Sequence, residues 1–220
     1  MKKKSNLLAL VVLDITTFVL MVLGITFSIF DVRFMGDFPR LSSLPIWMTF
    51  TGLSNVFIGL ICLTCAIYRL VKKEVVLPKI LFLIKIIALA DITITFLTTA
   101  LYLAPSIGTI WWRLYINNNI FNHFLTPLVA IVTFILFEGY VETDWKECFC
   151  SLIPLAMYGI FYVINVYTHL TPEGESSLTY DIYGFCRFGV FVLILFLIGF
   201  AAISFGLTIL YSFLNKQKRS

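Results

Sequence analysis

Charged side chains are scarce in this sequence of 220 residues. Asp, Glu, Lys and Arg together make up 13% of the chain, whereas soluble domains carry roughly 25%. The apolar residues, 60% of the total, form long blocks and do not alternate with polar residues. This composition excludes a soluble enzyme, a disordered chain and a disulfide-stapled secreted domain, and it indicates an integral membrane protein. The net charge of +4 comes from basic residues that flank apolar blocks, so we expect no nucleic-acid partner.

Six apolar stretches are long enough to cross a membrane, since a transmembrane helix needs roughly 20 mainly apolar residues. They cover residues 7–30, 46–69, 78–103, 119–138, 149–168 and 185–214. The strands of membrane barrels are shorter and alternate in hydropathy, which these blocks do not. The sequence therefore predicts an all-α polytopic bundle of six transmembrane helices, forming a single domain over residues 1–220.

Six spans place both termini on one side of the membrane, and the distribution of basic residues indicates which side. The termini and the even-numbered loops hold Lys2, Lys3, Lys4, Arg69, Lys72, Lys73, Lys79, Lys146, Lys216, Lys218 and Arg219. The odd-numbered loops hold Arg33, Arg40, Arg113 and Arg187. We therefore expect both termini in the cytoplasm. The localisation predicted is the cell membrane, and the abundance of Lys, Ile and Phe without a glycosylation sequon favours a bacterial plasma membrane.

Polar side chains line one face at the start of the second and fourth spans. Thr51, Ser54 and Asn55 follow the i, i+3, i+4 spacing of a single helix face. In the fourth span, Asn122 and His123 share a face with two further polar residues, Asn119 and Thr126. Thr51 and His123 each lie roughly 8 Å below the outer end of their spans at 1.5 Å per residue. The spacing thus places both side chains at one depth, where they can point into the bundle.

The third and fifth spans bring further polar groups to that layer. Asp91 begins a stripe of threonines, Thr95, Thr98 and Thr99, and the fifth span carries Tyr158, Tyr162 and Asn165. We expect a polar pocket with one imidazole in the outer half of the bundle. Asp14 and Lys85 lie nearer the cytoplasmic ends of their spans, and we interpret them as a buried ion pair, with a proton or ion path as the alternative.

A hydroxyl becomes a nucleophile when a neighbouring base accepts its proton. Thr51 and His123 offer such a pair, and the amide of Asn122 or Asn55 is a candidate donor to an oxyanion. The G-x-S-x-G and H-E-x-x-H motifs of soluble hydrolases are not found in the sequence. A site in the outer half of the bilayer takes its substrate laterally from the lipid, which favours an ester with an acyl chain.

Three segments resemble one membrane family. They are Phe50-Thr51-x-x-Ser54-Asn55, Asn122-His123-x-x-x-Pro127 and Pro154-x-x-x-Tyr158. The family is that of the androgen-induced proteins, which includes the androgen-dependent regulator of tissue factor pathway inhibitor, and a bacterial branch of six-helix proteins is similar to it. The resemblance implies a threonine hydrolase of fatty acid esters of hydroxy fatty acids. It implies Thr51 as nucleophile, with Thr49 as the alternative alignment, and His123 as general base.

Two other function classes stay open at this point. One is a small proton-coupled transporter, although we find no internal repeat and no pair of Gly- or Pro-broken helices in matched positions. The other is a non-catalytic membrane scaffold whose polar stripes bond its helices to one another. Cys62, Cys65, Cys148 and Cys150 are better explained as packing residues than as a zinc site, because the first pair lies within a span. We therefore expect no metal and no cofactor, and a membrane lipid as the partner.

Overall fold

The computed structural model describes residues 2–35, 44–106, 108–172, 174–175, 177 and 179–219. The chain is 80% helical, and no strand occurs among these residues. Six helices are long and apolar enough to cross a membrane: Asn6–Ile29, Phe50–Lys72, Lys79–Ser106, Asn118–Phe137, Trp145–Tyr167 and Val190–Lys216. Each lies within a few residues of a predicted span, so the all-α, six-span class is confirmed and the chain is a multi-pass membrane protein.

Several of these spans are built from more than one helical element. In chain order the elements are α1 (Lys2–Ile29), η1 (Ile46–Met48), α2 (Phe50–Lys72), α3 (Lys79–Thr98), η2 (Thr99–Leu103), α4 (Ala104–Ser106), η3 (Gly108–Tyr115), α5 (Asn118–Ile120), η4 (Phe121–Leu125), α6 (Thr126–Phe137), η5 (Trp145–Ser151), α7 (Leu152–Tyr167), η6 (Cys186–Phe188), α8 (Val190–Lys216) and η7 (Gln217–Arg219). The segments η2 and η4 are π-helical turns, and the other η segments are 3₁₀-helical.

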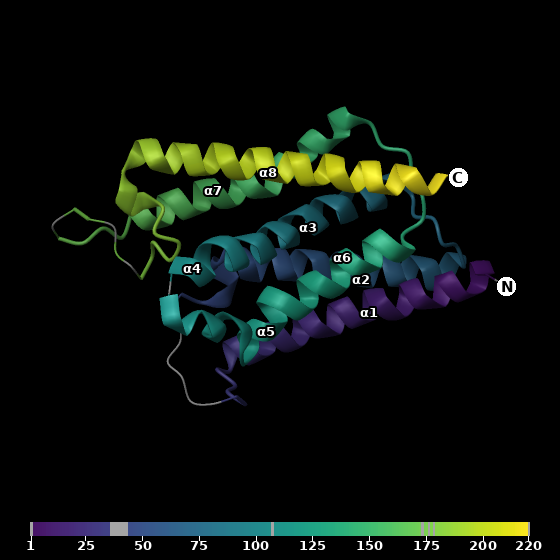
Figure 1. Cartoon of the computed structure of the whole chain (residues 1–220), viewed down its shortest axis with the longest axis horizontal. Coiled ribbons are helices and arrows are strands. Elements are labelled where there is room, and N and C mark those ends of the chain that lie inside the picture. Colours follow the sequence, from purple (N-terminus) through teal and green to yellow (C-terminus); the bar gives the residue numbers. More distant parts are fainter. Residues whose placement is uncertain are drawn as a thin grey trace.

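Helix α3 occupies the middle of the bundle. It packs against α2 and α6 on one side and against α8 on the other. Figure 1 shows α7 and α8 side by side along one flank, with α1 on the opposite flank. The span that contains α3 is consequently the most buried of the six described spans, whereas α8 leaves large apolar side chains such as Phe191 and Ile198 exposed on the outside of the bundle.

Both termini lie at the same end of the bundle, as six antiparallel spans require (Figure 1). The connections from α2 to α3 and from α6 to η5 lie at that end too. The turns from α4 to α5 and from α7 to η6 lie at the opposite end, called here the distal end. Arg40, which entered the topology prediction, lies outside the described residues, as do the side chains of Lys2, Lys3, Lys4, Arg187 and Arg219.

The π-helical turn η4 has a local cause in the sequence. The N–H of Thr126 bonds to the carbonyl of Phe121, which is the five-residue spacing of a π turn. The next donor in that register is residue 127, a proline, which has no N–H. The carbonyl of Asn122 therefore accepts from the side-chain amide of Asn55 on α2, at 2.9 Å. Because Pro127 has no N–H, a backbone carbonyl of the fourth span is left to accept a hydrogen bond from a neighbouring helix.

Four charged side chains form a closed cluster nearer the end that holds the termini. Lys85 Nζ lies 2.8 Å from Asp14 Oδ1 and 2.6 Å from Glu138 Oε2, and Arg69 pairs with the same two carboxylates. These side chains are at most 2% exposed. The predicted Asp14–Lys85 pair is confirmed. Arg69, which the topology argument counted as a loop charge, lies instead in the last turn of α2 with its side chain buried, because the two carboxylates neutralise it there.

Candidate functional site

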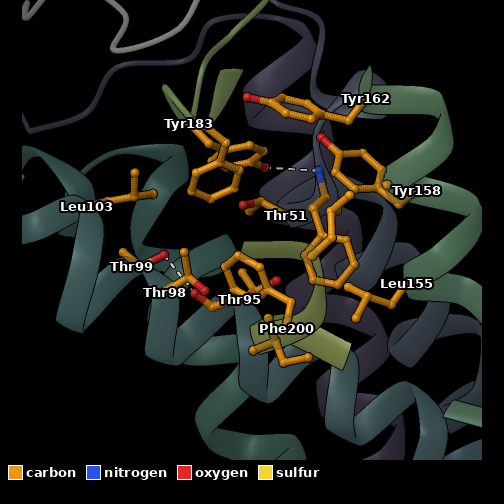
Figure 2. Close-up of a pocket in the computed structure, with 15 residues that line it drawn as sticks. Thr51, Thr95, Thr98, Thr99, Leu103, Leu155, Tyr158, Tyr162, Tyr183 and Phe200 are labelled. Atoms are coloured by element: carbon orange, nitrogen blue, oxygen red, sulfur yellow. Dashed lines mark hydrogen bonds between the residues drawn. The ribbon is translucent and has the colours of Figure 1, made fainter. Parts of the chain in front are cut away.

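A partly open cavity lies at the distal end, between the α7–α8 pair and the α2–α3 pair (Figure 2). About 570 Å³ of space not occupied by atoms lies within its outline, and part of this space is open to the outside of the protein. Its walls are largely aromatic and aliphatic, with hydroxyls from threonine and tyrosine. The lining residues are Phe50, Thr51, Ile94, Thr95, Thr98, Thr99, Leu103, Leu155, Tyr158, Gly159, Tyr162, Tyr183, Phe185, Leu197 and Phe200. The cavity is amphiphilic and suits a molecule with an apolar chain and a few oxygen atoms.

Thr51 stands in the cavity wall in the first turn of α2. Thr49, two residues earlier, is the N-cap of this helix. Its side-chain hydroxyl accepts a hydrogen bond from the Gly52 N–H at 3.0 Å and donates one to the Ile46 carbonyl at 2.7 Å. Gly52 is needed here because a Cβ would overlap the Ile46 carbonyl. The Thr49 hydroxyl is thus engaged in starting the helix. This arrangement leaves Thr51 as the threonine of α2 that faces the cavity.

The hydroxyl of Tyr183 reaches into the same corner of the cavity. It accepts from the Phe50 N–H at 3.1 Å and also interacts with the hydroxyls of Thr51 and Tyr158. Figure 2 shows its ring directly above Thr51. Burial raises the pKa of Tyr183 above its ordinary value, so the phenol stays protonated at neutral pH and can donate a hydrogen bond. The sequence analysis missed this residue, which belongs to the loop between α7 and α8.

The predicted polar face of α2 makes contact with two other helices. Ser54 and Thr95 share a hydrogen bond of 2.7 Å between their hydroxyls, which joins α2 to α3. Asn55 donates to the Thr51 carbonyl at 2.7 Å as well as to the Asn122 carbonyl. Both N–H donors of the Asn55 amide are therefore used within the bundle, whereas its Oδ1 atom has no hydrogen-bond partner among the described residues. Its expected role as a donor to an oxyanion does not agree with this bonding.

Asn122 and His123 are buried in the π turn η4, but neither is among the described residues that line the cavity. The amide of Asn122 donates to the Ser28 hydroxyl at 3.0 Å and to the Gly24 carbonyl at 3.3 Å, both on α1. His123 Nδ1 lies 2.9 Å from the carbonyl of Leu114. The sequence predicted a pocket that includes the imidazole; the cavity instead has tyrosines and threonines as its polar groups.

The π turn also explains why the polar residues of the fourth span do not point in one direction as predicted. A π turn adds one residue, so side chains before and after it lose the regular helical spacing. Asn119 bonds to the carbonyl of Arg113, while Asn122 turns to α1 and Thr126 is fully buried. Pro127 was the signal in the sequence that indicated an irregular helix here.

Helix α7 contributes Tyr158 and Tyr162 to the cavity, as its predicted polar stripe suggested. The Tyr162 hydroxyl donates to Asp181, a carboxylate that is only 2% exposed. Asp181 also accepts from the Cys186 N–H at 3.1 Å. These bonds fasten the loop before α8 to α7, and this loop holds Tyr183 and Phe185 in the cavity. Asn165, the third member of the stripe, is buried one turn beyond Tyr162 and is not among the described lining residues.

Asp91 lies on the cavity-facing stripe of α3, one turn deeper than Thr95. It is 2% exposed, and its Oδ1 atom has no hydrogen-bond partner among the described residues. It is not one of the described lining residues. A buried carboxyl group therefore lies one helical turn from the lining residue Thr95.

The described residues contain no cluster of three or more His, Cys, Asp or Glu side chains suited to a metal ion. Cys62 and Cys65 are buried in α2, in the apolar cluster that includes Ile58 and Phe82. The polar groups that line the cavity are the hydroxyls of threonine and tyrosine side chains, among them Thr51 at the start of α2. No protein-family model, curated protein or solved structure matches this chain.

Proposed function

We propose that this protein is an intramembrane hydrolase of lipid esters, with Thr51 as the nucleophile. The observation that carries the proposal is the position of Thr51: its hydroxyl lies in the wall of a largely apolar cavity, within a bundle of membrane-spanning helices. An acyl chain fits such walls, and the substrate enters from the surrounding lipid. The resemblance of the Thr51 and His123 segments to the androgen-induced protein family supports the same reaction class.

In the proposed reaction, Thr51 Oγ attacks the ester carbonyl carbon while its proton passes to a base. The carbonyl electron pair moves to oxygen, and the tetrahedral intermediate expels the alcohol, which takes up the proton. Water then hydrolyses the acyl-threonine and releases the fatty acid. The N–H groups of Phe50 and Gly52 are already bonded to Tyr183 and Thr49, so the first turn of α2 favours the negative oxygen through the dipole of the helix and not through free N–H groups. Tyr183 supplies a further hydroxyl donor beside Thr51.

His123 is the base in this proposal. The Leu114 carbonyl can only accept, so Nδ1 of the neutral ring carries the proton and Nε2 keeps its lone pair. Asn55 links the turn of His123 to the backbone of Thr51 through its two hydrogen bonds. Because His123 is not among the described lining residues, the proton must pass through a water molecule or another intervening group.

The test is labelling of the purified protein in nanodiscs with a fluorophosphonate probe, followed by hydrolysis of a fluorogenic fatty acid ester. Thr51→Ala should lose both activities, and Thr64→Ala should keep them. Thr64 is the matched control, because it is an exposed threonine of the same helix whose hydroxyl bonds only to Leu60 in its own helix. Full activity of Thr51→Ala would overturn the proposal for the nucleophile.

Two further variants separate the remaining assignments. Thr49→Asn removes the alternative hydroxyl but keeps a side-chain oxygen that can cap α2, so activity should be retained. His123→Gln should lose activity while the melting temperature stays near that of the wild type. If His123→Gln remains active, the base is another group and only that assignment fails.

We also propose that both termini face the cytoplasm and that the cavity lies in the outer half of the membrane. The excess of basic residues at the termini and even-numbered loops supports this orientation. An impermeant maleimide should label Glu175→Cys in intact cells and Lys73→Cys only after permeabilisation. The opposite pattern would invert the topology.

A further inference from the structure

We infer that the cavity takes an uncharged lipid ester and discriminates against lipids that carry a phosphate or a free carboxylate near the ester. This inference rests on the proposed function for the ester group, and it concerns the charge of the substrate. It departs from the fatty acid esters of hydroxy fatty acids that the resemblance implies, because those esters carry a free carboxylate. It is carried by the walls of the cavity and by the carboxyl groups next to them.

No described lining residue of the cavity carries a charged side chain. Recognition of phosphate or carboxylate in proteins relies on Arg, Lys or free backbone N–H groups. The N–H of Phe50 at the start of α2 is already bonded to the Tyr183 hydroxyl. Arg69 and Lys85 lie in the charge cluster, where both are paired with Asp14 and Glu138. An anion in the cavity thus loses its water without gaining a cation.

Two buried carboxyl groups lie close to residues that line the cavity. Asp181 lies behind Tyr162, and Asp91 lies one turn below Thr95 with one oxygen unpartnered among the described residues. Both are 2% exposed, so neither is well screened by water. An ionised carboxylate repels a second anion, and a protonated one still offers no positive charge. An anionic ligand is therefore disfavoured for two reasons: the described lining offers no cation, and the nearby ionisable carboxyl groups are acidic.

The polar groups that do line the cavity match an uncharged ester. Hydroxyls of Thr51, Tyr158 and Tyr183 meet at one corner. The Tyr158 hydroxyl donates to the Met48 carbonyl at 3.4 Å, so Thr51 and Tyr183 are the candidate donors to ester or alcohol oxygens. The remaining walls include Phe185, Phe200 and several aliphatic side chains, which suit an acyl chain. A monoacylglycerol combines these properties.

The test measures binding in the Thr51→Ala protein, which cannot turn over ester. Monoolein, oleic acid and oleoyl lysophosphatidylglycerol share one acyl chain and differ in head-group charge. Native mass spectrometry in an uncharged detergent should show monoolein binding at least about tenfold more tightly than either anionic lipid. Equal or tighter binding of oleic acid or of the lysophospholipid in the cavity would overturn the inference, as would no binding of monoolein.

Two neighbouring residues of α7 establish whether the bound lipid is in the cavity. Gly159 lines it, and an added Cβ would stand 3.1 Å from Leu197, so Gly159→Leu fills part of the space. Ile160 is 63% exposed on the lipid-facing side, so Ile160→Leu is the matched control. Selective monoolein binding should be lost in the first variant and kept in the second. Binding that persists in Gly159→Leu would locate the lipid elsewhere and contradict the inference.

A gain of function tests the role of charge directly. Thr98 lines the cavity on α3; Thr98→Lys supplies a cation there, and Thr98→Met supplies a similar length without charge. Only the lysine variant should gain affinity for oleic acid, by about tenfold. If monoolein binds selectively but the wild type does not cleave it, the proposed hydrolysis fails while the charge preference stands. If esters are cleaved regardless of charge, the preference fails alone.

Discussion

The ammonium group of Lys85 on α3 lies 2.6 Å from a carboxylate oxygen of Glu138 at the end of α6, 53 residues away in the chain. Together with Asp14 and Arg69, these two residues form a cluster of two positively and two negatively charged side chains. Each member comes from a different span or its end, so the cluster joins α1, α2, α3 and α6. Its formal charge is zero, and this balance is what makes four buried ionic groups tolerable within the bundle.

Removing one charge of the cluster should be more harmful than removing an opposite pair. Lys85→Met leaves Asp14 and Glu138 with Arg69 alone, and we expect a loss of about 3–5 kcal/mol of stability. The double variant Lys85→Met/Glu138→Gln restores the balance of charge and should recover part of that loss. Thermal unfolding in detergent gives both values. A double variant as unstable as the sum of the single ones would show that charge balance is not the cause.

The bond between Asn55 and the Asn122 carbonyl should depend on Pro127. Asn55→Leu leaves this carbonyl without its donor and should cost about 1 kcal/mol. Pro127→Ala supplies a backbone N–H in the register of the π turn, so Asn55→Leu should cost less in that background. A double-mutant cycle measured by unfolding tests this coupling. Strictly additive effects would mean that the proline does not govern the bond.

Tyr183→Phe should loosen the start of α2. The Phe50 N–H then has no acceptor, and a buried unpaired donor costs about 1–3 kcal/mol. Ester hydrolysis should fall as well, because Thr51 loses the neighbouring hydroxyl. Tyr180→Phe is the control, since Tyr180 lies in the same loop and stacks on His169, away from the described lining residues. Equal effects of the two variants would count against a specific role for Tyr183.

The reactivity of the Cys186 thiol indicates how firmly the loop before α8 is held. Burial, with the neighbouring Asp181, raises the pKa of its thiol to about 11. Because the thiolate is the reactive form, its alkylation rate should rise roughly tenfold per pH unit and keep rising above pH 9. Asp181→Asn removes both the charge and an anchor of the loop, so labelling of Cys186 at pH 8 should become faster. Mass spectrometry of the alkylated peptide measures this rate, and an unchanged rate would show that Asp181 does not hold the loop.

The spans and several helix faces could be predicted from the sequence because hydropathy and a period of 3.6 residues determine them. The contacts of Ser54 with Thr95 and of Asp14 with Lys85 follow from such faces. Glu138 could have been added to the charge cluster, since it is an acidic residue at the end of an apolar run. Arg69, which pairs with Glu138 in the cluster, is predicted to be a loop residue when only its charge is considered.

The loop residues of the site could not be predicted in this way. Tyr183 and Phe185 reach the cavity through an irregular segment, for which periodicity gives no direction. The orientation of His123 also escaped prediction, because the π turn breaks the regular spacing on which a helix face depends.

The charge cluster has a consequence for biogenesis. Asp14 is synthesised 55 residues before Arg69 and 71 before Lys85, so the first span leaves the ribosome with a carboxylate that has no cation. Stable placement of that carboxylate in hydrocarbon is costly until a partner arrives. The last of the four charges, Glu138, arrives only as the fourth span is completed. The four charges are therefore balanced only once the first four spans have packed together, and the first span alone carries a carboxylate whose partners lie in later helices.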